Sequence, residues 1–301
     1  MRPAELPGGR RRRSGALSIR PRKIAPMIRF TKGHGTENDF VIVEDAEAAF
    51  DPDATWVAAV CDRRAGIGAD GLLRVVPTKA MSGFEADAAA APWFMDYRNA
   101  DGSIAEMCGN GVRVFARYLV EQGLARAGRF AVATRGGLKE VVVPEDAAGE
   151  ITVDMGRSAW PEGTAQVLVG ERWLPSVNVD MGNPHAVVFV DDVAEAGRLY
   201  EQPSLRPEGV YPRGVNVEFV ASEGERRIAM RVFERGVGET RSCGTGACAA
   251  MLAAARRDGA APGTPYQVRV PGGLLRIVEL EDGRVEMTGP AVLVATGELA
   301  L

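Results

Sequence analysis

The sequence predicts an α+β protein built from two similar domains. Short β-rich segments punctuated by glycine fill most of the chain and helical patterns are few, which argues against a doubly wound parallel sheet. The chain also repeats itself, because the frame MCGNG at 107–111 returns as SCGTG at 242–246. The two cysteines lie 135 residues apart, and Gly136 and Gly272 lie 136 apart. We therefore expect a duplicated, pseudo-symmetric unit with a boundary near Val153, giving domains at 27–152 and 153–288.

The elements follow in order from Met27, where folding signals begin. The segment MIRFTKGHGTENDFVIVED predicts a strand, a glycine-rich loop and a second strand. Helical spacing covers 53–61, 111–123 and 246–259, and the last two segments end on a glycine, which is a common helix stop. The remaining predicted strands are LLRVVP, RFAVATRGG, KEVVVP, ITVDMG, AVVFVDD, VNVEFV, RIAMRVFERG, YQVRVPGG, LLRIVELEDG and RVEMTG.

Composition excludes several classes of protein. The chain has 301 residues, of which 46% are apolar and 25% charged, and these are ordinary values for a globular protein. No stretch approaches the ~18 apolar residues that cross a bilayer, and the N-terminus lacks the apolar core of a secretory signal. Beyond residue 26 the chain carries a net charge of −11, which disfavours nucleic-acid binding. We expect a soluble cytoplasmic protein that binds neither nucleic acid nor membrane.

The basic head, residues 1–26, differs from the rest. It holds eight basic residues and one acidic residue, and it has no hydrophobic periodicity. We interpret it as a disordered extension, or as extra residues ahead of a true start at Met27. A transit peptide and an RNA-binding arm are weaker alternatives, because serine is scarce and no aromatic residue interleaves the arginines. Its removal is expected to leave the activity unchanged.

Cys108 and Cys243 are the candidate catalytic residues, because each stands just before a predicted helix. A helix N-terminus offers unpaired N–H groups and about half a positive charge, which lowers the pKa of a thiol. Glycines let backbone N–H groups approach a ligand and form a cradle for a carboxylate. One such cysteine is usually an inert buried residue, but two at duplicate positions favour function.

Facing domains would place the two thiols on either side of one carbon atom. That arrangement suits removal of a proton from one face of an α-carbon and delivery of another to the opposite face. The sulfur atoms would lie roughly 6–7 Å apart, with the substrate between them in the cleft. The helix ends would stabilise the negative charge that develops during the reaction.

Polar residues in loops at strand ends suit recognition of a second, unreactive end of a substrate. Any one of them is more often a turn residue, and Glu234 with Arg235 is alternatively a surface pair. His185 has an alternative as a hydrogen-bonded structural residue. The candidates are Asn38, Asn99, Asn183, His185, Asn216, Glu234 and Arg235.

A thiol-redox or metal-binding module is a non-enzymatic alternative. The chain has four cysteines and two histidines, without a C-x-x-C pair. A structural zinc site would have to be assembled from scattered residues, so we expect no metal. Cys61 and Cys248 match no catalytic position, and Cys248 is expected on an apolar helix face.

The motifs resemble those of the diaminopimelate epimerase family from about Met27 onward. They stand here as GTENDF, GIGADG, YRNADG, MCGNGVRVFARYL, MGNPH, GVNVEF and ERGVGETRSCGTGACA. The resemblance implies two domains, each a β-rich barrel-like sheet around a central helix, with the active site in the cleft between them. It implies that the final strand, within 289–301, returns to the first domain, and that the protein is a homodimer.

The resemblance also implies the activity. Family members interconvert LL- and meso-diaminopimelate, a precursor of lysine and peptidoglycan, without metal or pyridoxal phosphate. Cys108 and Cys243 would be the acid/base pair, tuned by His185 and Glu234. The resemblance implies that substrate is held by Asn38, Asn99, Asn183, Asn216, Glu234 and Arg235 and by two helix-end cradles, which comprise Gly109, Asn110, Gly244 and Thr245.

Two points limit the analogy. Many family members have a glutamine where this chain has Gly71, so a side-chain contact beside Asp70 is missing. Proline or hydroxyproline racemases and epimerases resemble the same architecture and also use paired cysteines. The four asparagines and ERGVGET favour the longer substrate with two amino-acid ends.

Overall fold

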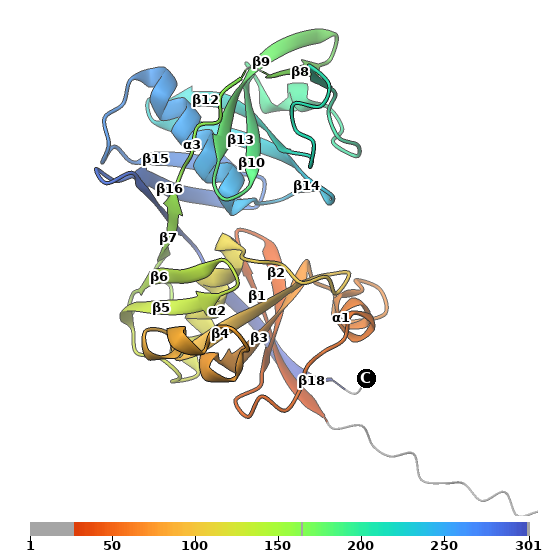
Figure 1. The fold of residues 1–301 in the computed structure, drawn as a ribbon, viewed down its shortest axis with the longest axis vertical. Helices are drawn as coiled ribbons and strands as arrows, with labels where there is room; N and C mark the ends of the chain where they lie inside the picture. Colours follow the sequence, from red (N-terminus) through yellow and green to blue (C-terminus); the bar gives the residue numbers. More distant parts are fainter. Residues whose placement is uncertain (1–26, 164, 300–301) are drawn as a thin grey trace, which may run out of the picture.

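The computed structural model of the chain describes residues 27–163 and 165–299 as an α+β fold of two domains (Figure 1). Each domain wraps a sheet around one long helix, as predicted. The basic head, 1–26, lies outside the described residues. Within the described part, no helix is both long and apolar enough to cross a membrane.

The first domain, drawn in red to yellow, contains α1 and α2. Its elements are β1 (Ile28–Gly35), β2 (Asn38–Glu44), α1 (Ala54–Cys61), β3 (Gly71–Pro77), η1 (Thr78–Ala80), η2 (Glu85–Ala89), β4 (Trp93–Asn99), α2 (Gly109–Glu121), β5 (Gly128–Thr134), β6 (Gly137–Val143) and β7 (Ile151–Arg157).

The second domain, drawn in green to blue, contains α3. Its elements are β8 (Ala165–Val169), β9 (Arg172–Asp180), β10 (Pro184–Phe189), η3 (Val193–Ala196), β11 (Leu205–Arg206), β12 (Asn216–Gly224), β13 (Arg227–Glu234), β14 (Gly238–Thr240), α3 (Gly244–Asp258), β15 (Tyr266–Val270), β16 (Gly273–Glu279) and β17 (Arg284–Gly289). The chain then continues into β18 (Val292–Leu299).

Strand pairing repeats between the domains. The series β18-β1-β2-β3-β4-β5-β6-β7 and the series β8-β9-β10-β12-β13-β15-β16-β17 pair in the same sequence of directions. Each series begins with two antiparallel pairs and ends with two antiparallel pairs. The three pairs between them are parallel, antiparallel and parallel. The predicted duplication is therefore visible in the topology as well as in the sequence.

The two halves share one continuous sheet. β7 pairs with β6 of the first domain and also, antiparallel, with β17 of the second. β18 pairs with β1, so the chain returns to the first domain after completing the second. The predicted boundary near Val153 falls inside β7, the strand that belongs to both pairings, and the domain limits themselves stay a prediction.

The two long helices begin two residues earlier than the sequence pattern predicted. Cys108 and Cys243 are their N-caps, and each sulfur accepts a hydrogen bond, from the N–H of Gly111 and of Gly246 respectively, at 3.4 Å. The hydrophobic pattern misses these first turns because they consist mainly of glycine. Both helices are buried along most of their length, as expected for central helices of their domains.

Candidate active site

The first turns of α2 and α3 meet where the two domains face each other. A Cβ built on Gly244 would lie 3.6 Å from the Cα of Gly109. The same Cβ would lie 3.2 Å from Cε of Met287, and one on Gly109 would lie 2.7 Å from Cε of Met155. A methyl group at Gly109 would displace the end of the Met155 side chain, whereas one at Gly244 would be in ordinary van der Waals contact with Gly109, so the two first turns lie in close contact. This contact brings both capping cysteines to one region of the molecule.

Cys108 is half-buried and lies against Asn38 of β2. Its Sγ donates to Asn38 Oδ1 at 3.5 Å, and Asn110 Nδ2 donates to the same oxygen at 3.2 Å. Two predicted site residues, Asn38 and Asn110, thus contact each other and the first thiol.

Cys243 is buried and lies beside Thr245 and Glu234. The Thr245 hydroxyl is 3.6 Å from Cys243 Sγ. Glu234, at the end of β13, accepts a hydrogen bond from the Thr240 hydroxyl, and its charge, second to burial, raises the pKa of the Cys243 thiol. The charge of Glu234 thus acts on the Cys243 thiol, while its predicted tuning role stays a prediction.

Burial governs the protonation of both thiols. Burial raises the pKa of Cys108 to about 11, although the N–H groups of Gly111 and Asn110 partly oppose it. Burial, followed by the charges of Glu234 and Glu218, raises the pKa of Cys243 well above its usual value. The helix ends were expected to lower these pKa values, but loss of water outweighs the helix dipole. Glu234 also raises the pKa of Cys108, so one carboxylate acts on both sulfur atoms.

The duplicated frames differ in the residues that support each helix. A Cβ on Gly111 of α2 would lie 3.5 Å from both Phe40 and Leu73. A Cβ on Gly246, the equivalent glycine of α3, would lie 2.8 Å from Oε1 of Glu218. An apolar support under Cys108 is therefore replaced by an ionisable one under Cys243.

Glu218 belongs to a fully buried pair with His185. Their strands pair in parallel, and Glu218 Oε1 lies 2.7 Å from His185 Nδ1. The other ring nitrogen of His185 lies 3.0 Å from Asn183 Oδ1, while Glu218 Oε2 is buried without a partner among the described residues. Burial raises the pKa of Glu218, although His185 opposes this. In this geometry His185 contacts neither sulfur directly but reaches the Cys243 region through Glu218.

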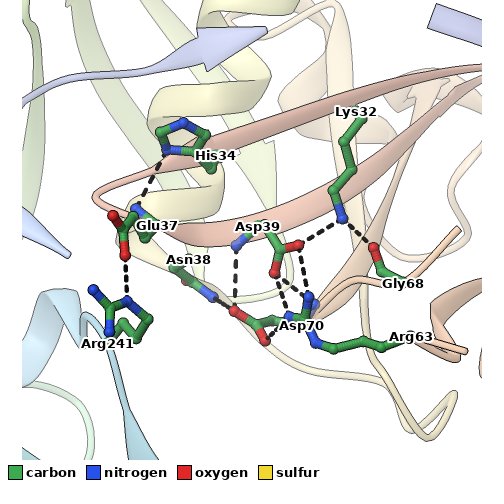
Figure 2. A network of polar contacts seen from close by, with 9 residues as sticks. All are labelled: Lys32, His34, Glu37, Asn38, Asp39, Arg63, Gly68, Asp70 and Arg241. Carbon is green, nitrogen blue, oxygen red and sulfur yellow. Dashed lines mark hydrogen bonds and ion pairs between the residues drawn. The ribbon is translucent and has the colours of Figure 1, made fainter. Parts of the chain in front are cut away.

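The turn between β1 and β2 docks on the second domain. Thr36 and Glu37 form a two-residue hairpin loop with φ of 50° and 60°, a left-handed conformation that costs non-glycine residues about 1–2 kcal/mol each. The Thr36 hydroxyl lies 2.7 Å from that of Ser242, and Glu37 pairs with Arg241 (Figure 2). These contacts hold Asn38, the next residue, against Cys108.

The remaining predicted binding residues make hydrogen bonds to neighbouring groups, and none of these bonds is to a sulfur atom. Asn216 accepts from the N–H of Arg235 at 2.9 Å and donates to the carbonyl of Pro184 at 3.3 Å. The exposed Arg235 guanidinium donates to the carbonyl of Arg213 at 3.1 Å. Asn99 donates to Ser103 at 2.9 Å and makes no side-chain hydrogen bond to another predicted site residue in the described structure.

Several residues of the site were missed by sequence analysis. Glu218 carries a signal in retrospect, because it is an acidic residue inside the apolar strand VNVEFV. Thr36, Ser242 and Arg113 carry no such signal in the sequence. Contacts between distant parts of the chain join Thr36 to Ser242 and Arg113 to Thr36. Arg113 is fully buried and donates to Asn110 Oδ1 at 2.9 Å.

The structure explains why a glycine, Gly71, stands beside Asp70. A Cβ at this position would lie 2.6 Å from the carbonyl oxygen of Arg98 and 2.7 Å from Cε2 of Tyr97. The Arg98 carbonyl and the Tyr97 ring therefore leave no room for a side chain at position 71 in this structure. Among the described residues, no group of three or more His, Cys, Asp or Glu side chains is arranged to hold a metal ion.

Comparison with known proteins identifies the family. The family model described as diaminopimelate epimerase matches residues 30–161 and 177–294. Diaminopimelate epimerase of Streptomyces coelicolor is 62% identical, covering 91% of this chain and 96% of that protein. The Thermobifida fusca protein of the same name is 51% identical, covering 91% and 98%.

Solved structures share the fold. A hydroxyproline epimerase from Agrobacterium vitis is 18% identical with a TM-score of 0.63, covering 91% of this chain and 93% of its own. A predicted epimerase from Pseudomonas aeruginosa is 16% identical with a TM-score of 0.67, covering 91% and 99%. At these identities the likeness concerns the fold alone. The family match and the closely similar relatives, together with the paired cysteine-capped helices, show that this chain belongs to the diaminopimelate epimerase family of isomerases.

Proposed function

We propose that the protein interconverts LL-2,6-diaminopimelate and meso-diaminopimelate by inverting one α-carbon, with Cys108 and Cys243 as the two acid/base residues. The observation that carries this proposal is the meeting of two cysteine-capped helix ends at the domain boundary. Relatives named for this activity over 91% of the chain support the substrate. The product would supply lysine and peptidoglycan synthesis.

Inversion needs two groups because of its geometry. One thiolate removes the α-proton from one face, and the opposite thiol delivers a proton to the other face. A single group would return the proton to the face from which it came. The chain's own side chains carry both transfers, so the proposed mechanism uses neither metal nor pyridoxal phosphate.

One thiol must first lose its proton, because burial keeps both thiols neutral in the free protein. We assign this step at Cys243 to Glu234, whose charge acts on this thiol and whose own pKa is raised by burial. Proton transfer from sulfur to this carboxylate leaves a thiolate beside a neutral acid. The ammonium group of a bound amino acid would stabilise that thiolate further. His185 would influence the proton transfer between Cys243 and Glu234 through its contact with Glu218.

The helix ends bind the reacting end of the substrate. Backbone N–H groups at Gly109, Asn110, Gly244 and Thr245 lie in the first turns, where the helix dipole favours an anion. They would hold the α-carboxylate and stabilise the charge that grows as the proton leaves. Asn38, Asn99, Asn183, Asn216 and Arg235 would hold the second amino-acid end.

We also infer a homodimer. β18 pairs with β1 along one edge, and no other described strand pairs with it. Val292 and Val294 on this strand are 44% and 60% exposed. Light scattering is expected to give twice the chain mass, and a monomer at micromolar concentration would contradict this inference.

The deciding experiment follows the proton. Pure protein is incubated with LL-diaminopimelate in deuterium oxide, and the products are resolved by stereochemistry and mass. We expect the meso isomer with solvent deuterium at one α-carbon, and we expect no turnover of proline or hydroxyproline. Absence of exchange from either diaminopimelate isomer would refute the proposal.

A further inference from the structure

Both the NH₂ group and the carbonyl oxygen of the Asn38 amide make hydrogen bonds. Its Nδ2 donates to Asp70 Oδ2 at 2.8 Å, and its Oδ1 accepts from Cys108 and Asn110. A carboxylate only accepts hydrogen bonds, so Asp70 selects the orientation in which the NH₂ group faces it. The carbonyl oxygen of Asn38 then necessarily faces the sulfur of Cys108.

Asp70 is itself held in place by a charged network (Figure 2). Arg63 Nη2 donates to Asp70 Oδ1 at 2.7 Å and to Asp39 Oδ1 at 2.6 Å. The N–H of Asp39 donates to Asp70 Oδ2 at 3.2 Å, and Lys32 Nζ lies 2.5 Å from Asp39 Oδ2. Two basic side chains thus pair with the two acidic ones, and Arg63 holds the side chain of Asp70 opposite Asn38. Burial opposes ionisation of Asp39, but Arg63 and Lys32 lower its pKa to about 2.

The orientation of Asn38 matters for the chemistry at Cys108. A carbonyl oxygen accepts the S–H proton and so favours the neutral thiol. If the amide turned over, its NH₂ group would donate to the sulfur and favour the thiolate instead. The state of Cys108 therefore depends on which end of Asn38 faces it.

Cys243 has no such arrangement. By strand pairing, Asn183 before β10 corresponds to Asn38 at the start of β2, yet its Oδ1 contacts His185. The neighbours of Cys243 are Thr245 and Glu234. The two thiols thus lie in duplicated frames with different hydrogen-bond partners.

We propose that Asp70 is a positioning residue, which fixes the amide of Asn38 so that its oxygen holds the Cys108 proton in the resting enzyme. The importance of this for turnover rests on the proposed function; the effect on the thiol does not. Asp70 and Arg63 are exposed, so replacing either leaves the core intact.

The test compares Asp70→Leu, which removes charge and acceptor, with Asp70→Asn, which removes the charge and keeps an acceptor. The rate of alkylation of Cys108 by iodoacetamide is measured against pH, by mass spectrometry of the peptides. We expect its midpoint to fall by about one pH unit in Asp70→Leu and by less in Asp70→Asn. The other charged or titratable groups near Cys108 (Glu234 of β13, Arg113 of α2 and Tyr97 of β4) are the same in both variants.

Cys243 in the same samples is the internal control, and its profile is expected to stay unchanged. Arg63→Met should shift Cys108 in the same direction, whereas Arg64→Met, its exposed neighbour, should not. In turnover, Asp70→Leu should lower kcat about tenfold and also raise KM, because Asn38 is one of the proposed substrate-binding residues as well as the partner of Cys108.

Equal shifts in the two Asp70 variants would show a purely coulombic effect and overturn the proposal. An unchanged Cys108 profile, or equal shifts at both cysteines, would also overturn it. Alkylation requires no substrate, so this result is independent of the deuterium experiment on the wild-type protein. Failure of that experiment would remove the proposed function and leave the assignment at Cys108 standing.

Discussion

The side chain of Asn110 donates a hydrogen bond to the backbone carbonyl of Ser242, 3.0 Å away, and so joins the helix of one domain to the loop before the other. The same Nδ2 reaches the Ser242 hydroxyl at 3.2 Å, while Arg113 donates to Oδ1. This fully buried residue links the two capping cysteines, since it follows Cys108 by two positions and contacts the residue before Cys243.

Asn110→Ala is expected to lower the free energy of unfolding by about 2–3 kcal/mol, because it leaves buried partners without hydrogen bonds. Turnover should fall as well, since the hydrogen bonds that join the segments carrying the two thiols are lost. Chemical denaturation and steady-state kinetics measure the two effects. Thr288→Val is a suitable control, because it removes the 2.8 Å hydroxyl contact to Thr152 on the β7–β17 pair. The control should lose about 1 kcal/mol and keep its turnover; equal losses of turnover would contradict a special role for Asn110.

Cys108→Ala and Cys243→Ala should each reduce epimerisation by roughly 10³-fold or more while the fold is retained. Each variant lacks the acid/base group of one face, so inversion cannot be completed. Initial rates from both isomers and circular dichroism check this expectation. Cys248→Ala alters the same helix as Cys243 and should leave turnover nearly unchanged. Substantial activity in either single variant would exclude a two-thiol mechanism.

Glu218→Gln should make Cys243 easier to ionise. The Glu218 charge is one cause of the raised pKa of Cys243, after burial and Glu234. Removing this charge should move the alkylation profile of Cys243 to lower pH and leave that of Cys108 unaltered. In the Asp70 variants, by contrast, the profile of Cys108 should move and that of Cys243 should not. A shift confined to Cys108 would show that the buried pair acts on the other thiol.

Alkaline pH should destabilise the protein through its buried thiols. Burial raises the pKa of Cys61 to about 11 and of Cys248 to about 12, against about 8.5 for a thiol in the unfolded chain. The folded state then holds these protons more tightly, so the stabilisation is complete below pH ~8.5 and is lost as pH rises toward 11–12. Unfolding free energies measured between pH 8 and 11 should fall, and less steeply in Cys248→Ala. Parallel slopes would contradict this origin.

Gly71→Ala should destabilise the first domain by about 1–3 kcal/mol, since the added methyl group meets the Arg98 carbonyl and the Tyr97 ring. A thermal melt measures the change. A variant as stable as the wild type would mean that the Tyr97 ring yields, and that a larger side chain fits beside Asp70 in this chain too.

The sequence predicted the fold class, the long helices and the duplication, because each of these leaves a local or repeated pattern. Helix starts were placed two residues late, since glycines at 109, 111, 244 and 246 carry no hydrophobic signal. The candidate thiols were found because they repeat. Their roles, and those of the binding residues, stay predictions.

The rest of the site could not be predicted because it arises from contacts across long stretches of chain. Ser242 is an unremarked polar residue until its hydroxyl meets Thr36 from the other domain. The raised pKa of Cys108 depends on burial, which a motif does not encode. Glu218 differs from these, because an acid within an apolar strand already indicates a special environment.

The pairing of β18 with β1 has a consequence for biosynthesis. The ribosome synthesises β1 early, and β1 can pair with β2 at once, but its second partner, β18, is synthesised only after every element of the second domain. The first domain therefore cannot complete its sheet until the second domain has been translated.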